Sequence, residues 1–102
     1  MTENLSIKQA SDLLQSKHLS SKELIEIYLN KIKAGKELNC YNFVSEETAL
    51  LDAIKSDERR TSNSLKGDFD GIPIGVKDLF CTPGILTTAS SKILSNFIPT
   101  YE

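Results

Sequence analysis

The first sixty residues place apolar side chains at the spacing of amphipathic helices, about 3.6 residues per turn. Two helix starts carry a serine followed three residues later by a side chain that can complete a capping box, at Ser6 with Gln9 and at Ser20 with Glu23. The pattern predicts one helix running to about Lys17. It predicts a second helix that ends at Gly35, because glycine commonly follows the last helical turn.

A third helix is predicted to begin after Ser45, which can cap it. Acidic residues occupy its first turn and Arg59 and Arg60 its last, the arrangement that the helix dipole favours. Its inner face is expected to be apolar, with Ala49, Leu50, Ala53 and Ile54.

Two segments have the pattern of β-strands. The first is the short run 39–44, which is rich in residues that favour strands. In the second, 71–78, apolar Ile72, Ile74 and Val76 alternate with Pro73, Gly75 and Lys77, so the two sets lie on opposite faces. This alternation predicts a buried strand with a lysine at its end.

The order of these elements favours an α/β fold with N-terminal helices and the first strands of a larger mixed sheet. Two strands form only a marginal sheet alone, so we expect the sheet to be incomplete within this chain. We interpret residues 1–102 as the N-terminal part of a single domain, helical over 1–37, with a helix and the first strands over 38–102.

Composition excludes several function classes. The chain has 102 residues, 39% hydrophobic content and a net charge of −2, which fit a small globular segment and argue against phosphate-dependent nucleic-acid binding. We expect no membrane span and a location in the cytoplasm, or in an organelle matrix if a targeting segment is missing. Cys40 and Cys81 are expected to be reduced packing residues, and the single histidine, His18, to lie at the surface without a metal.

Lys77 has two interpretations from spacing alone. It can reach solvent and pair with Asp78, or it can be a base, because desolvation disfavours the charged form of a buried lysine. Hydroxyl residues follow it closely, namely Thr82, Thr87, Thr88, Ser90 and Ser91. A lysine beside a hydroxyl is one means of activating an oxygen nucleophile for acyl transfer.

The run from Gly71 to Asp78, followed by Thr87-Thr88-Ala89-Ser90-Ser91-Lys92, resembles the amidase signature family. That resemblance implies a Ser-cisSer-Lys triad in which Lys77 is the general base. Both triad serines of the family lie beyond the position of Glu102, so we expect this chain to be a fragment that is inactive alone. The resemblance also implies that Ser90 and Ser91 do not replace them.

Within the family the likeness is to the ammonia-releasing, glutamine-hydrolysing component of tRNA-dependent amidotransferases, which convert Glu-tRNA(Gln) to Gln-tRNA(Gln). It implies B and C subunits of a heterotrimer as partners, with tRNA bound through one of these partners. ATP and Mg would be used by that partner, and this segment would bind no cofactor or metal. The alternatives are a free-standing amidase of the same family, or a non-catalytic interaction module in which Lys77 forms a salt bridge.

Overall fold

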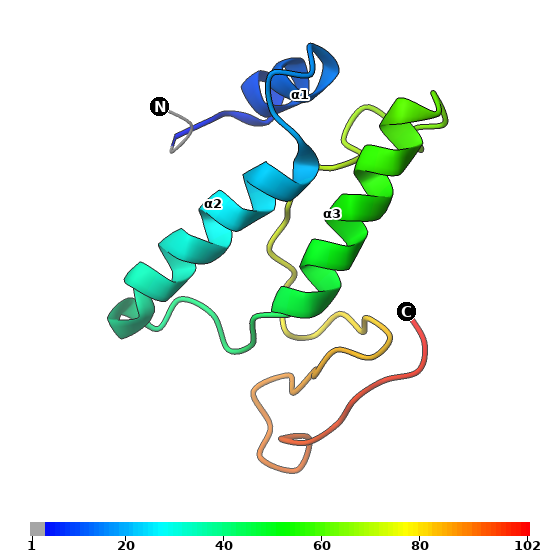
Figure 1. Cartoon of the computed structure of the whole chain (residues 1–102). Helices are drawn as coiled ribbons and strands as arrows, with labels where there is room; N and C mark the ends of the chain where they lie inside the picture. The colour runs from blue at the N-terminus through cyan, green and yellow to red at the C-terminus, as the bar shows by residue number, and fades with distance from the viewer. Residues whose placement is uncertain (1–3) are drawn as a thin grey trace. The chain divides into compact units, whose positions relative to one another are not determined.

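The computed structural model describes residues 4–102. The described part contains the three α-helices that the hydrophobic pattern predicts, and a short 3-10 helix (Figure 1). In chain order they are α1 (Ile7–Gln15), α2 (Ser21–Ala34), η1 (Lys36–Leu38) and α3 (Glu46–Thr61). No helix in this part of the chain is long and apolar enough to cross a membrane.

The starts of α1 and α2 are fixed by the predicted serine caps. At α1, the Ser6 hydroxyl accepts from the backbone N–H of Gln9 at 3.1 Å, and the Gln9 side chain accepts from the backbone N–H of Ser6 at 2.8 Å. The capping box predicted there is therefore complete. At α2, the Ser20 hydroxyl accepts from the Glu23 N–H at 3.1 Å.

The helix ends follow from backbone geometry. Helix α1 stops at Gln15, slightly before the predicted position, because Lys17 has a left-handed φ of 62° that cannot continue a helix. Helix α2 ends as predicted, with Gly35 as its cap and the Gly35 N–H donating to the Lys31 carbonyl at 2.9 Å.

Two apolar clusters form the core, and α2 contributes to both. Leu24 of α2 packs with α1 and the following turn, in a cluster whose buried members are Ala10, Leu14, Leu19 and Leu24. On another part of α2, Ile25 and Leu29 pack with Ala53 of α3. Helices α2 and α3 therefore lie against each other, as Figure 1 shows.

The chain divides into two compact units. Unit 1 comprises the residues up to Asn39 together with Glu46–Pro73, and it contains all the described helices and both apolar clusters. Unit 2 comprises Cys40–Ser45 and Ile74–Glu102, and its described backbone forms turns and loops.

The predicted strands at 39–44 and 71–78 are wrong for this structure. The described residues contain no strand. Their β pairing consists of an isolated antiparallel bridge between Thr82 and Ile85. Ile74 is 80% exposed and Val76 54%, so the alternating face is not buried. A strand needs ladder hydrogen bonds from a neighbour, and neither segment has one here. The helical part of the α/β prediction is confirmed, and its sheet is not.

Candidate functional site

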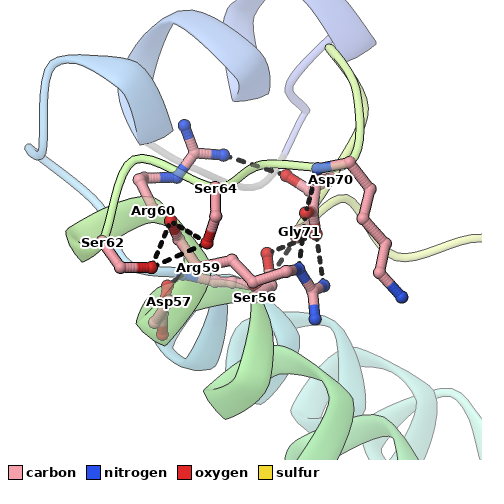
Figure 2. A network of polar contacts seen from close by, with 10 residues as sticks. Ser56, Asp57, Arg59, Arg60, Ser62, Ser64, Asp70 and Gly71 are labelled. Atoms are coloured by element: carbon pink, nitrogen blue, oxygen red, sulfur yellow. Dashed lines mark hydrogen bonds and ion pairs between the residues drawn. The ribbon is translucent and has the colours of Figure 1, made fainter.

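A polar network surrounds Asp70, immediately before the lysine segment 71–78. Arg59, near the end of α3, donates to the Asp70 carboxylate through Nε at 2.8 Å and Nη2 at 2.6 Å. Figure 2 shows the guanidinium facing this carboxylate. The same carboxylate accepts from the Ser56 hydroxyl at 2.7 Å and from the Lys66 backbone N–H at 3.0 Å. Four donors therefore converge on a side chain that is only 5% exposed.

The network also controls the charge state of Asp70. The hydrogen bonds from Arg59 hold the pKa of the Asp70 carboxyl well below its usual range, with smaller contributions from Lys66 and Ser56, and they outweigh the opposing effect of burial. The same interaction raises the pKa of Arg59. Asp70 thus remains a carboxylate, and Arg59 a cation, across the physiological pH range.

The backbone that follows Asp70 is held in place from two helices. Arg60 of α3 donates to the Asp70 carbonyl at 2.9 Å, and Ser21 of α2 donates to the Gly71 carbonyl at 2.8 Å. Gly71 has a left-handed φ of 96°, and a Cβ there would lie 2.8 Å from the Ser56 hydroxyl oxygen. Only glycine fits this position without strain. The first residue of the lysine segment is therefore fixed by packing as well as by hydrogen bonds.

Asp57 of α3 forms a second tie to α2 that the sequence analysis missed. Its carboxylate accepts from the backbone N–H of Ser21 at 2.7 Å and of Lys22 at 3.1 Å. A carboxylate suits these otherwise unpaired donors at a helix N-terminus. No local signal marks this cap, because 35 or 36 residues separate the partners.

Lys77, the predicted base, lies in unit 2 with an exposed side chain. Its backbone carbonyl accepts from the Phe80 N–H at 3.0 Å, which closes a turn. No partner of its ammonium is present among residues 4–102. The predicted burial of this lysine is therefore wrong in this structure, while its role as a base stays a prediction.

Asp78 bonds to the hydroxyl-rich run and forms no ion pair with Lys77 in the described part of the chain. Its carboxylate accepts from the Thr88 backbone N–H at 2.8 Å, from the Thr88 hydroxyl and, at 3.3 Å, from the Asn42 amide. Its backbone carbonyl accepts from the Ala89 N–H at 2.7 Å. The Thr88 hydrogen bonds lower the pKa of Asp78 below its usual value, because they stabilise the charged form.

The hydroxyl-rich run is mostly engaged with its own loop. Thr87 is buried, and its hydroxyl donates to the Ile85 carbonyl at 3.1 Å. Thr88 bonds to Asp78, and its hydroxyl oxygen accepts from the Ser90 N–H at 3.3 Å. Thr87 and Thr88 therefore satisfy polar groups within unit 2. Ser90 is exposed and Ser91 half-buried, and neither hydroxyl contacts Lys77 among the described residues.

The remaining candidate residues, His18 and the two cysteines, do not form a second catalytic or metal-binding site among the described residues. His18 is exposed, as predicted, with Nδ1 2.7 Å from the Ser16 hydroxyl. Cys81 is half-buried, but Cys40 is exposed, so the prediction that both are packing residues is wrong for Cys40. Across the described residues, no group of histidine, cysteine and acidic side chains could hold a metal ion.

Chemically, the arrangement presents one primary amine on a backbone that is fixed by the turn to Phe80 and by the bonds of Asp78. Lys77 can accept or donate a proton, and its exposed stem allows the amine to reach a group placed beside unit 2. Among residues 4–102, no serine hydroxyl is hydrogen-bonded to the Lys77 amine. The described residues therefore present the amine of Lys77 without a serine hydroxyl bonded to it.

Comparison with known proteins gives a consistent result. A family model described as Amidase matches residues 23–102. The A subunit of the glutamyl-tRNA(Gln) amidotransferase of Caulobacter vibrioides is 46% identical over 99 residues, covering 97% of this chain and 20% of that protein. The corresponding A subunit of Wolbachia sp. subsp. Brugia malayi is 45% identical over 100 residues, covering 96% of this chain and 20% of that protein.

A mitochondrial relative extends this set. The mitochondrial A subunit of the glutamyl-tRNA(Gln) amidotransferase of Anopheles gambiae is 46% identical over 92 residues, covering 90% of this chain and 19% of the relative. No solved structure matches the chain. The chain spans about a fifth of the length of the curated relatives that it matches.

Proposed function

The chain belongs to the amidase family, and on that premise we propose that it supplies the general base of a glutamine-hydrolysing site in a tRNA-dependent amidotransferase. The observation that supports this most strongly is the match to relatives named as amidotransferase A subunits, which extends over 97% of the chain at 46% identity. Because the chain spans only about a fifth of those proteins, the substrate, the partners and the complete site belong to the proposal.

Lys77 has the role of the base in the proposed mechanism. Its neutral amine takes a proton, through a bridging serine, from the hydroxyl of a second serine. The resulting oxygen nucleophile attacks the amide carbon of glutamine, and the C–N bond breaks as the nitrogen receives the proton and leaves as ammonia. Water then hydrolyses the acyl-enzyme. In this mechanism both serines come from sequence other than residues 1–102. Ser90 and Ser91 do not take these roles.

The proposed assembly is a heterotrimer with B and C subunits. In it, tRNA is bound through one of these partners, which uses ATP and Mg to activate the tRNA-bound glutamate. This segment itself binds no cofactor or metal in the proposal. Its contribution is Lys77, whose backbone is fixed by the turn to Phe80 and by the Asp78 hydrogen bonds.

A chimera offers a direct test. Residues 1–102 would replace the matching fifth of the Caulobacter vibrioides protein, which supplies the remaining four-fifths of the polypeptide. The chimera would be purified with its partner subunits. We expect it to release ammonia from glutamine, and Lys77→Ala to lower kcat by about 10²–10⁴-fold, because that is the typical contribution of general base catalysis.

The matched control is Lys92→Ala, which removes another lysine from unit 2. We expect glutaminase activity close to that of the unmodified chimera. If Lys77→Ala retains that activity as well, the assignment of the base is wrong, and the interaction-module alternative gains support.

The same assay separates the two enzymatic alternatives. A component of an amidotransferase should hydrolyse glutamine faster when tRNA, ATP and the partner subunits are present. The rate of a free-standing amidase should not change when these three are added. Ammonia release that depends on Lys77 but not on these additions would favour the free-standing amidase.

A further inference from the structure

Asp78 makes an unusual set of contacts for a residue next to an exposed lysine. The two oxygens of its carboxylate accept from the N–H and the hydroxyl of Thr88, and its carbonyl accepts from the Ala89 N–H at 2.7 Å. Both the side chain and the backbone of Asp78 are thus bonded to the same loop. All of these residues lie in unit 2.

The loop that Asp78 holds has a strained backbone. Ala89 and Ser90 have left-handed φ angles of 48° and 58°, and the Ser91 N–H donates to the Thr88 carbonyl at 2.8 Å. This is the pattern of a type I′ turn, whose central positions favour glycine and asparagine. Alanine and serine in these positions cost free energy, so the turn needs stabilising contacts from elsewhere. Asp78 provides them.

The consequence for Lys77 follows from the covalent chain. The Lys77 carbonyl is fixed by the Phe80 N–H at 3.0 Å, and the next residue is fixed by its three bonds to the loop. The backbone at the root of the lysine side chain is therefore held on its C-terminal side, while the amine remains exposed. When the backbone of a long flexible side chain is fixed, the side chain reaches a smaller volume.

We propose that Asp78 is a positioning residue for Lys77, acting through its bonds to Thr88 and Ala89. This inference rests on the proposed function, because it assumes that the Lys77 amine is the base. Asp78 does not touch the reacting atoms. It keeps the loop 87–91 and the lysine backbone in one fixed arrangement, so that the amine stays within reach of its proton donor.

The first test uses the 102-residue chain and does not require activity. Asp78→Asn preserves side-chain shape but replaces one acceptor oxygen with a donor that faces the Thr88 donors. Amide hydrogen exchange measured by NMR should be faster at Thr88, by about tenfold or more, because the Thr88 N–H loses its charged acceptor. Exchange at Ala89, whose N–H bonds to the Asp78 backbone carbonyl, should also become faster, because the side-chain bonds that hold the loop beside Asp78 are weakened. Unchanged exchange at both amides would overturn the proposal whatever the activity.

The second test uses the glutaminase assay of the chimera. Asp78→Asn should lower kcat by about tenfold to hundredfold and leave the KM for glutamine nearly unchanged, because an incorrectly placed base slows the chemical step. Thr88→Val, which removes the hydroxyl but keeps the N–H, should lower kcat less. Thr88→Ser restores the hydroxyl and should recover most of the rate.

The double variant Asp78→Asn with Thr88→Val distinguishes positioning from general destabilisation. If the two residues act as one unit, the combined loss in kcat should be smaller than the product of the two single losses. Independent losses, or a higher KM at constant kcat, would contradict the positioning role.

The two levels of proposal fail differently. If Lys77→Ala leaves glutaminase activity intact, the proposed function fails, and the assignment of Asp78 fails with it. If Lys77→Ala abolishes activity while Asp78→Asn leaves kcat unchanged, Lys77 remains the base and only the positioning role is wrong.

Discussion

Unit 1 and unit 2 use different interactions to define their conformations. Unit 1 buries leucine and isoleucine between helices, and Leu14 and Leu24 are completely inaccessible to solvent. Unit 2 has none of the described apolar clusters, and several of its large apolar side chains are exposed, including Ile74, Val76, Phe80 and Ile93. Its described contacts are mainly hydrogen bonds of turns and of Asp78.

This difference separates structural stability from the proposed chemistry. Hydrophobic burial stabilises a unit without requiring any particular polar contact, whereas a conformation defined by a few hydrogen bonds depends on each one. The predicted base is in unit 2, and the helices are in unit 1. Variants in unit 1 should therefore change mainly the free energy of unfolding. Variants in unit 2 should change mainly local amide exchange and the proposed activity.

The largest expected effect is in the core of unit 1. Leu24→Ala should lower the free energy of unfolding by about 2–5 kcal/mol, because it removes a completely buried side chain and leaves a cavity. Circular dichroism at 222 nm during urea unfolding measures this directly, since all the described helices lie in unit 1.

Ile93→Ala is the matched variant in unit 2. Ile93 is 90% exposed, so the same loss of apolar volume should change the free energy of unfolding by no more than about 0.5 kcal/mol. Equal effects of the two variants would show that unit 2 has its own apolar core and would remove the distinction between the units.

A smaller effect is expected at the Asp70 network, where unit 1 leads into the lysine segment. Asp70→Asn should lower the free energy of unfolding by about 1.5–3 kcal/mol at pH 7, because the Arg59 and Ser56 donors lose a charged acceptor. Ser62→Ala, at an exposed position beyond α3, is the surface control and should have little effect.

The pH dependence has a definite sign. The pKa of Asp70 is lower in the folded chain than its ordinary value of 3.8, so its stabilising contribution is complete above about pH 4 and is lost only as the pH falls toward the lower folded-state value. The difference in unfolding free energy between the original chain and Asp70→Asn should therefore be constant near neutral pH and shrink in acid. A difference that grows in acid would contradict the ion pair.

The sequence was sufficient for the elements whose signals are local. Ser6 with Gln9 predicts a capping box, and the structure forms it, because both partners lie within one helical turn. The strand at 71–78 has an equally regular local pattern, but a strand depends on pairing with a neighbour, which its own alternation cannot supply. The prediction therefore failed where the required interaction is non-local.

The candidate site shows the same limit. The position of Lys77 and the hydroxyl-rich run were evident from spacing and from the family resemblance. The bonds from Asp78 to Thr88 span ten residues and depend on the path of a loop, so no periodic pattern indicates them. Asp57 bonds to a helix start more than thirty residues away and is equally hidden from sequence.

A small predicted gain in stability tests whether the turn of unit 2 is strained, as its φ angles indicate. Ala89→Gly should stabilise that turn by about 0.5 kcal/mol, because removing Cβ relieves a left-handed conformation and this gain exceeds the greater flexibility of the unfolded chain. The Ser91 amide, which bonds to the Thr88 carbonyl at 2.8 Å, should then exchange more slowly.

Ala49→Gly in α3 is the opposite case, because Ala49 lies inside a helix of unit 1 and has no left-handed φ. There the same substitution should lower the free energy of unfolding by about 1 kcal/mol, since glycine is a poor helix former. Opposite signs for one chemical change would show that unit 2 keeps a conformation its residues disfavour, which makes the Asp78 contacts necessary. If Ala89→Gly also speeds exchange at Ser91, the turn is unstrained, and Asp78 has no strain to offset.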